Sequence, residues 1–167
     1  MNIQKVRYKN TFSVIFDVQP ELYEYCIVKL VLQPILENAI NYGVGSMDDC
    51  GEIKVTGRMQ GENIILSVTD NGLGMTEEEV DLILTDSKRI RKHGSGVGLV
   101  NVNNRIQILF GKEYGLVVES EPDEGTTVSI CIPAVLYTED NREDLEKGRM
   151  FRKEETAKEV QVKRDDE

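Results

Sequence analysis

The chain has 167 residues, of which 40% are hydrophobic and 30% charged, which suits one ordinary domain with a single core. Its formal net charge of −10 disfavours nucleic acid or an anionic membrane surface as the main partner, because both would repel it. No apolar run approaches the roughly 18 residues of a membrane span. The three cysteines, Cys26, Cys50 and Cys131, form no CxxC pair. We therefore expect a cytoplasmic protein without direct membrane contact.

The first third of the chain predicts one strand and one helix. Residues 1–11 are interpreted as the remnant of a linker, and the alternating β-formers of residues 13–18 predict a strand. Apolar residues recur at helical spacing over residues 27–42. Pro34 should begin or kink this helix, because proline lacks an N–H group and crowds the preceding turn.

Two predicted hairpins supply the remaining strands, at residues 52–59 with 63–70 and at residues 116–120 with 126–132. Between the hairpins, Thr76 and Glu79 form a capping box that should open a short helix, and apolar spacing predicts a second helix over residues 99–110. Residues 136–167 are almost all charged and predict a tail that is disordered or helical. The domain itself is expected over residues 12–135.

The order of these elements predicts the fold class. Strands that arrive mostly as hairpins, with helices between the pairs, favour an α+β fold. We expect a two-layer α/β sandwich whose mixed, mostly antiparallel sheet is covered by helices on one face. A Rossmann fold would need a regular βαβ alternation, which this chain lacks.

Asp70 ends a predicted strand in the stretch TDNGLGM and should lie at the rim of the core. A carboxylate only accepts hydrogen bonds, and its natural neutral partner is an exocyclic amine such as that of adenine. Gly72 and Gly74 would let a planar ligand lie against the backbone. A plain Asp-Asn-Gly turn is the alternative.

The stretch GSGVGL contains Gly94, Gly96 and Gly98 directly before a predicted helix. Its N–H groups would converge on anionic oxygens at the positive end of that helix, and a flexible loop is the alternative. A Walker loop is excluded because the pattern GxxxxGK[ST] is absent. The preceding cations would meet a phosphate tail or lie in a solvated loop: Lys88, Arg89, Arg91 and Lys92.

Asn38 and Asn41 lie one turn apart in the predicted helix, although asparagine is a poor helix former. A side-chain carbonyl oxygen on a rigid helix suits Mg²⁺, which takes the rest of its shell from water and phosphate. A polar stripe on an exposed helix is the alternative. His93 is the only histidine, and no Ser/His/Asp or Cys/His arrangement can be assembled around it, so we assign no catalytic residue.

In order along the chain, LQPILENAINYG, VTDNGLGM and GSGVGLVNVNNRI resemble the N box, the G1 box (DxGxG) and the G2 box (GxGxGL) of the GHKL ATPase superfamily, which has the Bergerat fold. The residues within these boxes are most similar to those of the catalytic ATP-binding (HATPase) domain of YesM-like two-component sensor histidine kinases. The resemblance covers about residues 7–133. It implies a domain that transfers the ATP γ-phosphate to a histidine on a separate dimerisation domain, for signalling to a response regulator.

The same resemblance implies roles for individual residues. Asp70 would accept the adenine amine, directly and through a water that Thr126 also holds, and Asn38 would ligate Mg²⁺. Further ATP-binding positions are implied at Asn41, Tyr42, Gly72, Gly74, Met75, Gly94, Ser95, Gly96, Val97, Gly98 and Leu99. The roles of Asn101 and Arg105, which continue the G2 box, stay open.

The chain also departs from the family pattern. Pro34 stands where gyrase-like members carry the glutamate that activates water, so fast hydrolysis is not expected. Asn41 and Tyr42 replace the Lys-His of many relatives, so one phosphate-neutralising charge is missing. The family's phosphoacceptor histidine belongs to a preceding helical domain, which suggests a fragment of a membrane-anchored sensor. The alternatives are a degenerate nucleotide-binding module and a serine kinase of the anti-sigma type.

Overall fold

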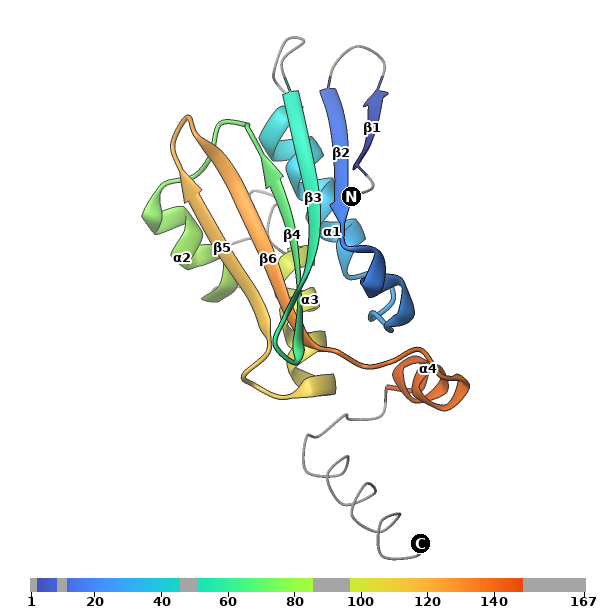
Figure 1. Ribbon diagram of the computed structural model, residues 1–167. Coiled ribbons are helices and arrows are strands. Elements are labelled where there is room, and N and C mark those ends of the chain that lie inside the picture. The colour runs from blue at the N-terminus through green and yellow to red at the C-terminus, as the bar shows by residue number, and fades with distance from the viewer. Residues whose placement is uncertain (1–2, 9–11, 46–50, 86–96, 149–167) are drawn as a thin grey trace, which may run out of the picture.

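The computed structural model describes residues 3–8, 12–45, 51–85 and 97–148 (Figure 1). Six strands form one sheet in the order β1-β2-β3-β4-β6-β5. Their bounds are β1 (Ile3–Tyr8), β2 (Phe12–Val18), β3 (Gly51–Gln60), β4 (Asn63–Asp70), β5 (Gly115–Glu121) and β6 (Gly125–Pro133). Strands β2 and β3 are parallel, and every other neighbouring pair is antiparallel.

The described helices are the 3-10 helix η1 (Pro20–Glu24), α1 (Leu32–Asn38), the π-helix η2 (Ala39–Val44), α2 (Glu77–Thr85), α3 (Val97–Phe110) and α4 (Glu139–Glu146). Helices α1, η2 and α3 cover one face of the sheet, and α2 lies beside β5 (Figure 1). The predicted two-layer α+β sandwich with a mixed sheet is therefore confirmed. None of the helices in these ranges is long and apolar enough to cross a bilayer.

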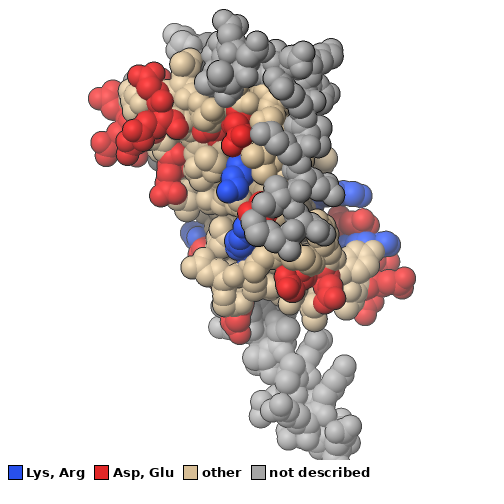
Figure 2. All heavy atoms as spheres, turned by 45° about the horizontal axis from the view of Figure 1, so that its top comes forward, with Lys and Arg blue, Asp and Glu red and all other residues tan. Residues whose placement is uncertain are grey.

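The alternation of apolar and polar side chains along the central strands decides which face of the sheet becomes the core. The inward residues of β4 and β6 are buried in one core with helix residues such as Ile35, Leu99 and Ile106. These inward residues are Ile64, Leu66, Val68, Val128, Ile130 and Ile132. The opposite face carries cross-strand hydroxyl pairs, Ser67 with Ser129 at 2.9 Å and Thr69 with Thr127 at 3.0 Å. Antiparallel sheets solvated on one side show this pattern. Acidic side chains gather toward the edges of the molecule (Figure 2).

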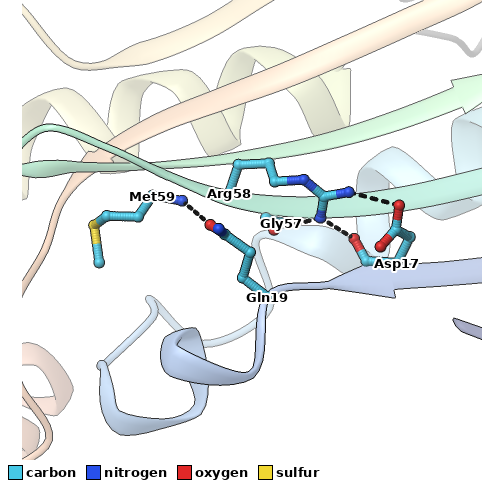
Figure 3. Close-up of polar contacts among 5 residues, drawn as sticks. All are labelled: Asp17, Gln19, Gly57, Arg58 and Met59. Atoms are coloured by element: carbon cyan, nitrogen blue, oxygen red, sulfur yellow. Dashed lines mark hydrogen bonds and ion pairs between the residues drawn. The ribbon is translucent and has the colours of Figure 1, made fainter. Parts of the chain in front are cut away.

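A cluster of polar contacts fixes the end of β2 against β3 (Figure 3). The Arg58 guanidinium contacts the Asp17 carboxylate at 2.5 Å, and it also donates to the carbonyl oxygens of Asp17 at 2.6 Å and Gly57 at 2.8 Å. The Gln19 side chain accepts a hydrogen bond from the Met59 amide at 2.5 Å. Asp17 is buried, so the guanidinium supplies the partners that its carboxylate needs. The chain leaves this anchored point to enter η1.

The structure differs from the sequence expectations in two places on this side of the sheet. Residues 1–11, expected as a linker, contain β1, which pairs with β2 from Ile3 opposite Asp17 onward and covers its edge. The helix expected over residues 27–42 begins only at Leu32, because Leu30 has a φ of 65° and interrupts it. Pro34 lies in the first turn of α1, as predicted. The division into linker, domain and tail stays a prediction.

Candidate functional site

Asp70 is the last residue of β4, on the face that the helices cover. It lies between Ile53 of β3 and Thr126 of β6, and only 4% of it is exposed. Its Oδ1 atom accepts a hydrogen bond from the Gly72 amide at 2.9 Å. Burial raises the pKa of this carboxyl above its usual value, and backbone hydrogen bonds from Gly72 and Thr126 offset part of the rise. The predicted rim position of the acid is thus confirmed.

The backbone of several glycines lies so close to this carboxylate, or to its neighbours, that a side chain at these positions would not fit. A Cβ atom on Gly43 would lie 2.5 Å from Cγ and Oδ1 of Asp70. A Cβ atom on Gly72 would lie 2.3 Å from the carbonyl group of Gly43. Gly74 has a φ of 66°, and a Cβ there would lie 1.9 Å from the Glu121 carbonyl oxygen. The two G1-box glycines are therefore required by close backbone approach. Gly43, which ends the N-box stretch, is a third such glycine, and no role in the site had been predicted for it.

The π-helix η2 brings Gly43 to this place. A π turn contains an extra residue, so the buried positions Ala39 and Val44 are five residues apart and both face the sheet. Tyr42 ends the segment whose apolar residues recur at helical spacing, but the wide turn leaves it 48% exposed. Asn41 is also exposed, and Asn38 is half-buried at the end of α1. These three implied ATP-binding residues therefore come from the helical segment that passes over Asp70.

The loop after Asp70 is held to its neighbours at three points. Asn71 exchanges hydrogen bonds with the Glu52 backbone, through its side-chain oxygen at 2.7 Å and its amide at 3.2 Å. The Leu73 carbonyl oxygen accepts from the Asp123 amide at 2.7 Å. The third point is the amide of Met75, which donates to a side chain of β5. The loop is thus a fixed part of the site.

Ser120 of β5 is the partner of Met75, with its hydroxyl oxygen 2.9 Å from that amide. The same hydroxyl donates to the Gly125 carbonyl oxygen at 2.8 Å and lies 2.9 Å from the Thr126 hydroxyl. Since the Ser120 proton is used on Gly125, the Thr126 hydroxyl donates to Ser120. The lone pairs of Thr126 are then available to a donor beside Asp70, as the implied shared water requires. Sequence reasoning missed Ser120, although its place six residues before Thr126 across a predicted hairpin could have indicated it.

Ser120→Ala should lower the free energy of unfolding by about 1–3 kcal/mol, because the Met75 amide loses its acceptor. It should also weaken nucleotide binding. Urea unfolding and calorimetry with ADP would measure the two effects. Ser67→Ala, which removes a single hydroxyl pair on the helix-free face, is the matched control. Equal losses in the two variants would show that the Ser120 contacts do not hold the loop.

The G2 box is described only in part. Gly94, Ser95 and Gly96 lie outside the described residues, as do the four cations before them and His93. Val97 begins α3, and Gly98 follows so close to α1 that its Cβ would lie 3.0 Å from Cβ of Pro34. Leu99 is 1% exposed and packs in the core, so only its backbone could contact a ligand. The start of α3 therefore lies against the start of α1.

Asn38 is the one residue predicted to hold Mg²⁺. Its side chain makes no hydrogen bond to any other residue in the described ranges. No group of three or more His, Cys, Asp or Glu side chains within those ranges is arranged to hold a metal. A single amide oxygen fits Mg²⁺, which binds proteins through one or two ligands when phosphate and water complete its shell.

A cavity of about 700 Å³ adjoins Asp70 and Thr126 and extends around the β5–β6 turn. Carboxylates contribute strongly to its lining: Glu77, Glu119, Glu121 and Glu124. These side chains would repel a triphosphate, so only a neutral group such as a base suits this side of Asp70. A helix N-terminus such as that of α3 favours anions instead.

The chain is similar to known proteins in both sequence and fold. The chain is 37% identical over 134 residues to YwpD of Bacillus subtilis, covering 79% of this chain and 45% of that protein. It is 33% identical to the sensor histidine kinase YesM of Bacillus subtilis, covering 80% of this chain and 22% of that protein. The chain thus spans less than half the length of these relatives.

The fold is similar to that of the histidine kinase domain of the blue-light activated kinase EL346 of Erythrobacter litoralis, with a TM-score of 0.51, 20% identity, and coverage of 74% of this chain and 52% of that one. Residues 27–136 match the model of a family described as histidine kinase-, DNA gyrase B-, and HSP90-like ATPase. This match spans more than half of the chain. The chain therefore belongs to this ATPase family, as its three sequence boxes predicted, and is an ATP-binding domain.

Proposed function

We propose that this domain binds MgATP and presents the γ-phosphate to a histidine on a separate helical dimerisation domain of a longer, membrane-anchored sensor kinase. The phosphoryl group would then pass to a response regulator. One observation carries the proposal: Asp70, buried at the end of β4 against Gly43 and Gly72, offers acceptor atoms suited to the adenine amine. The similarity to YesM, whose name describes a sensor histidine kinase, supports the acceptor class.

The chemistry asked of the domain is mainly positioning. The base would lie at Asp70 and Thr126, and the phosphates would lie near Asn38 and the N-terminus of α3. Phosphoryl transfer depends chiefly on alignment and charge neutralisation, so the domain needs no general base of its own. Pro34 in the first turn of α1 offers no carboxylate to activate water, so bound ATP would be hydrolysed slowly.

The acceptor is tested by incubating the protein with γ-labelled MgATP, alone and with the histidine-bearing helical domain of the parent protein. We expect acid-labile phosphohistidine on the helical domain and no label on this chain alone. Acid-stable phosphoserine on a protein substrate would instead indicate a serine kinase. Nucleotide binding without transfer to the helical domain would indicate a degenerate module.

Asn38→Ala tests the proposed magnesium ligand. We expect roughly tenfold weaker binding of MgADP, about 1.4 kcal/mol, because one oxygen ligand is lost. Binding of ADP in EDTA should be unchanged. Calorimetry under the two conditions makes the comparison within one variant. An equal loss with and without Mg²⁺ would mean that the substitution damages the helix and not a metal site.

A further inference from the structure

The segment after β6, here called the strap (residues 134–147), folds back along residues 24–31, here called the connector, which run from the last residue of η1 to the start of α1. The Cys26 amide donates to the Val135 carbonyl oxygen at 2.7 Å, and the Tyr137 amide donates to the Glu24 carbonyl oxygen at 2.7 Å. Tyr25 forms an antiparallel bridge with the strap residue between them. The strap is therefore joined to the connector by backbone hydrogen bonds on both sides of this bridge.

Helix α4 completes the strap and has the features of a packed helix. Thr138 caps its N-terminus by accepting a hydrogen bond from the Asn141 amide at 3.1 Å. The Asn141 side chain donates back to the Leu136 carbonyl oxygen at 2.9 Å. Leu145 is only 7% exposed and belongs to the hydrophobic core. The sequence did not indicate that Leu145 is buried, because it is one apolar residue among the many charged residues of the segment 136–167.

The strap and α3 line a common cavity. A cavity of about 480 Å³ is lined by connector residues, by Arg105 of α3 and by Leu145 of the strap. Glu146, in the same lining, pairs with Lys29 of the connector at 3.5 Å. Figure 1 shows α4 at the lower end of the molecule, on the side of η1. The strap thus braces the chain that leads into α1 and approaches the helix that begins at the G2 box.

The connector needs such support. Leu30 has a φ of 65°, which an L-residue adopts at a cost of roughly 1–2 kcal/mol. Two residues beyond it α1 begins, and α1 carries Asn38 and continues into η2, which sets Gly43 against Asp70. The position of α1 therefore depends at one end on the sheet and at the other on the connector.

We propose that the strap positions α1 for nucleotide binding, with Leu145 as its anchor. Leu145 is a positioning residue: it would act through the connector and does not touch the nucleotide. This inference rests on one part of the proposed function, namely that the domain binds a nucleotide. Most of the strap, including α4, lies beyond the family match, which ends at residue 136.

The test is Leu145→Asp in the whole chain, with Ile108→Asp as the matched control because Ile108 is 65% exposed on α3. We expect the Leu145 variant to bind MgADP roughly tenfold more weakly. Because Asn38 moves with α1, the loss should be smaller for ADP in EDTA. Hydrogen exchange should accelerate in α4 and also in α1. Leu145→Met should restore affinity and exchange, and the Ile108 variant should match the wild type.

The proposal would be overturned if α4 is released, seen as faster exchange over residues 139–146, while exchange in α1 and the affinity for MgADP stay unchanged. If Leu145→Asp does not fold, Leu145→Ala is measured in the same way. A wild-type protein that binds no nucleotide would refute the proposed function, and the exchange of α1 would still decide the role of the strap.

Discussion

Replacing Asp70 with asparagine should weaken ADP binding by roughly 30- to 100-fold, which corresponds to about 2–3 kcal/mol. The substituted side chain can keep its oxygen on the Gly72 amide, as Oδ1 does in the wild type. Its NH₂ group then takes the place of Oδ2. A donor would face the adenine amine where an acceptor is needed, so one favourable hydrogen bond becomes a repulsive contact. Calorimetry with ADP on both proteins measures the loss.

The same substitution should leave the fold at least as stable. Because burial raises the pKa of Asp70 in the folded state, the folded protein holds this proton more tightly than the unfolded chain does. The contribution of this group to stability is therefore lost as the pH rises from about 4 through the folded-state pKa. Asparagine has no charge to bury, so urea unfolding at pH 7 should give an equal or higher free energy of unfolding. A lower value together with lost binding would assign Asp70 a structural role.

Gly43→Ala is expected to abolish measurable nucleotide binding and to lower the free energy of unfolding by about 1–3 kcal/mol. The new Cβ would stand 2.5 Å from Cγ and Oδ1 of Asp70, so the carboxylate or η2 must shift. Either movement separates the acceptor from the helical segment that carries Asn38. Calorimetry and urea unfolding on the same preparation would measure both effects.

Gly61→Ala is the matched control for this substitution. Gly61 lies in the β3–β4 turn with a φ of 62°, and an added Cβ would meet nothing within 4 Å. It should cost roughly 1 kcal/mol of stability through backbone strain and leave nucleotide binding unchanged. Normal binding by Gly43→Ala would show that the close approach of η2 to Asp70 is not needed for the site.

Five of the six strands could be predicted from the sequence, because alternation and turn residues are local signals. The alternating apolar residues Ile64, Leu66 and Val68 mark the buried face of β4, and the same alternation places Asp70 on that face at the end of the strand. Likewise, the capping box at Thr76 and Glu79 is formed, with the Thr76 amide 2.9 Å from the Glu79 carboxylate. Each of these features depends on residues a few positions apart.

Strand β1 was missed although its pairing with β2 is local. The other missed features depend on contacts between distant segments. The π turn of η2 has no distinct local pattern, so helical periodicity over residues 27–42 gave no sign that Gly43 belongs to the site. Its real constraint comes from Asp70, 27 positions further along the chain. Leu145 was missed for the same reason, because it joins a hydrophobic core whose other residues lie far away in the sequence. Composition described the tail correctly as charged but could not show that residues 136 and 137 pair with the connector.

The recognition of adenine by Asp70 is tested most directly with two ligands and two proteins. ADP is compared with the diphosphate of purine riboside, which lacks only the 6-amino group, on the wild type and on Asp70→Asn. We predict that the wild type prefers ADP by roughly 30- to 100-fold and that the variant shows almost no preference, so that the coupling between the amine and the carboxylate is about 2–3 kcal/mol. Equal preference for ADP in both proteins would contradict the account, because the amine would then be recognised elsewhere.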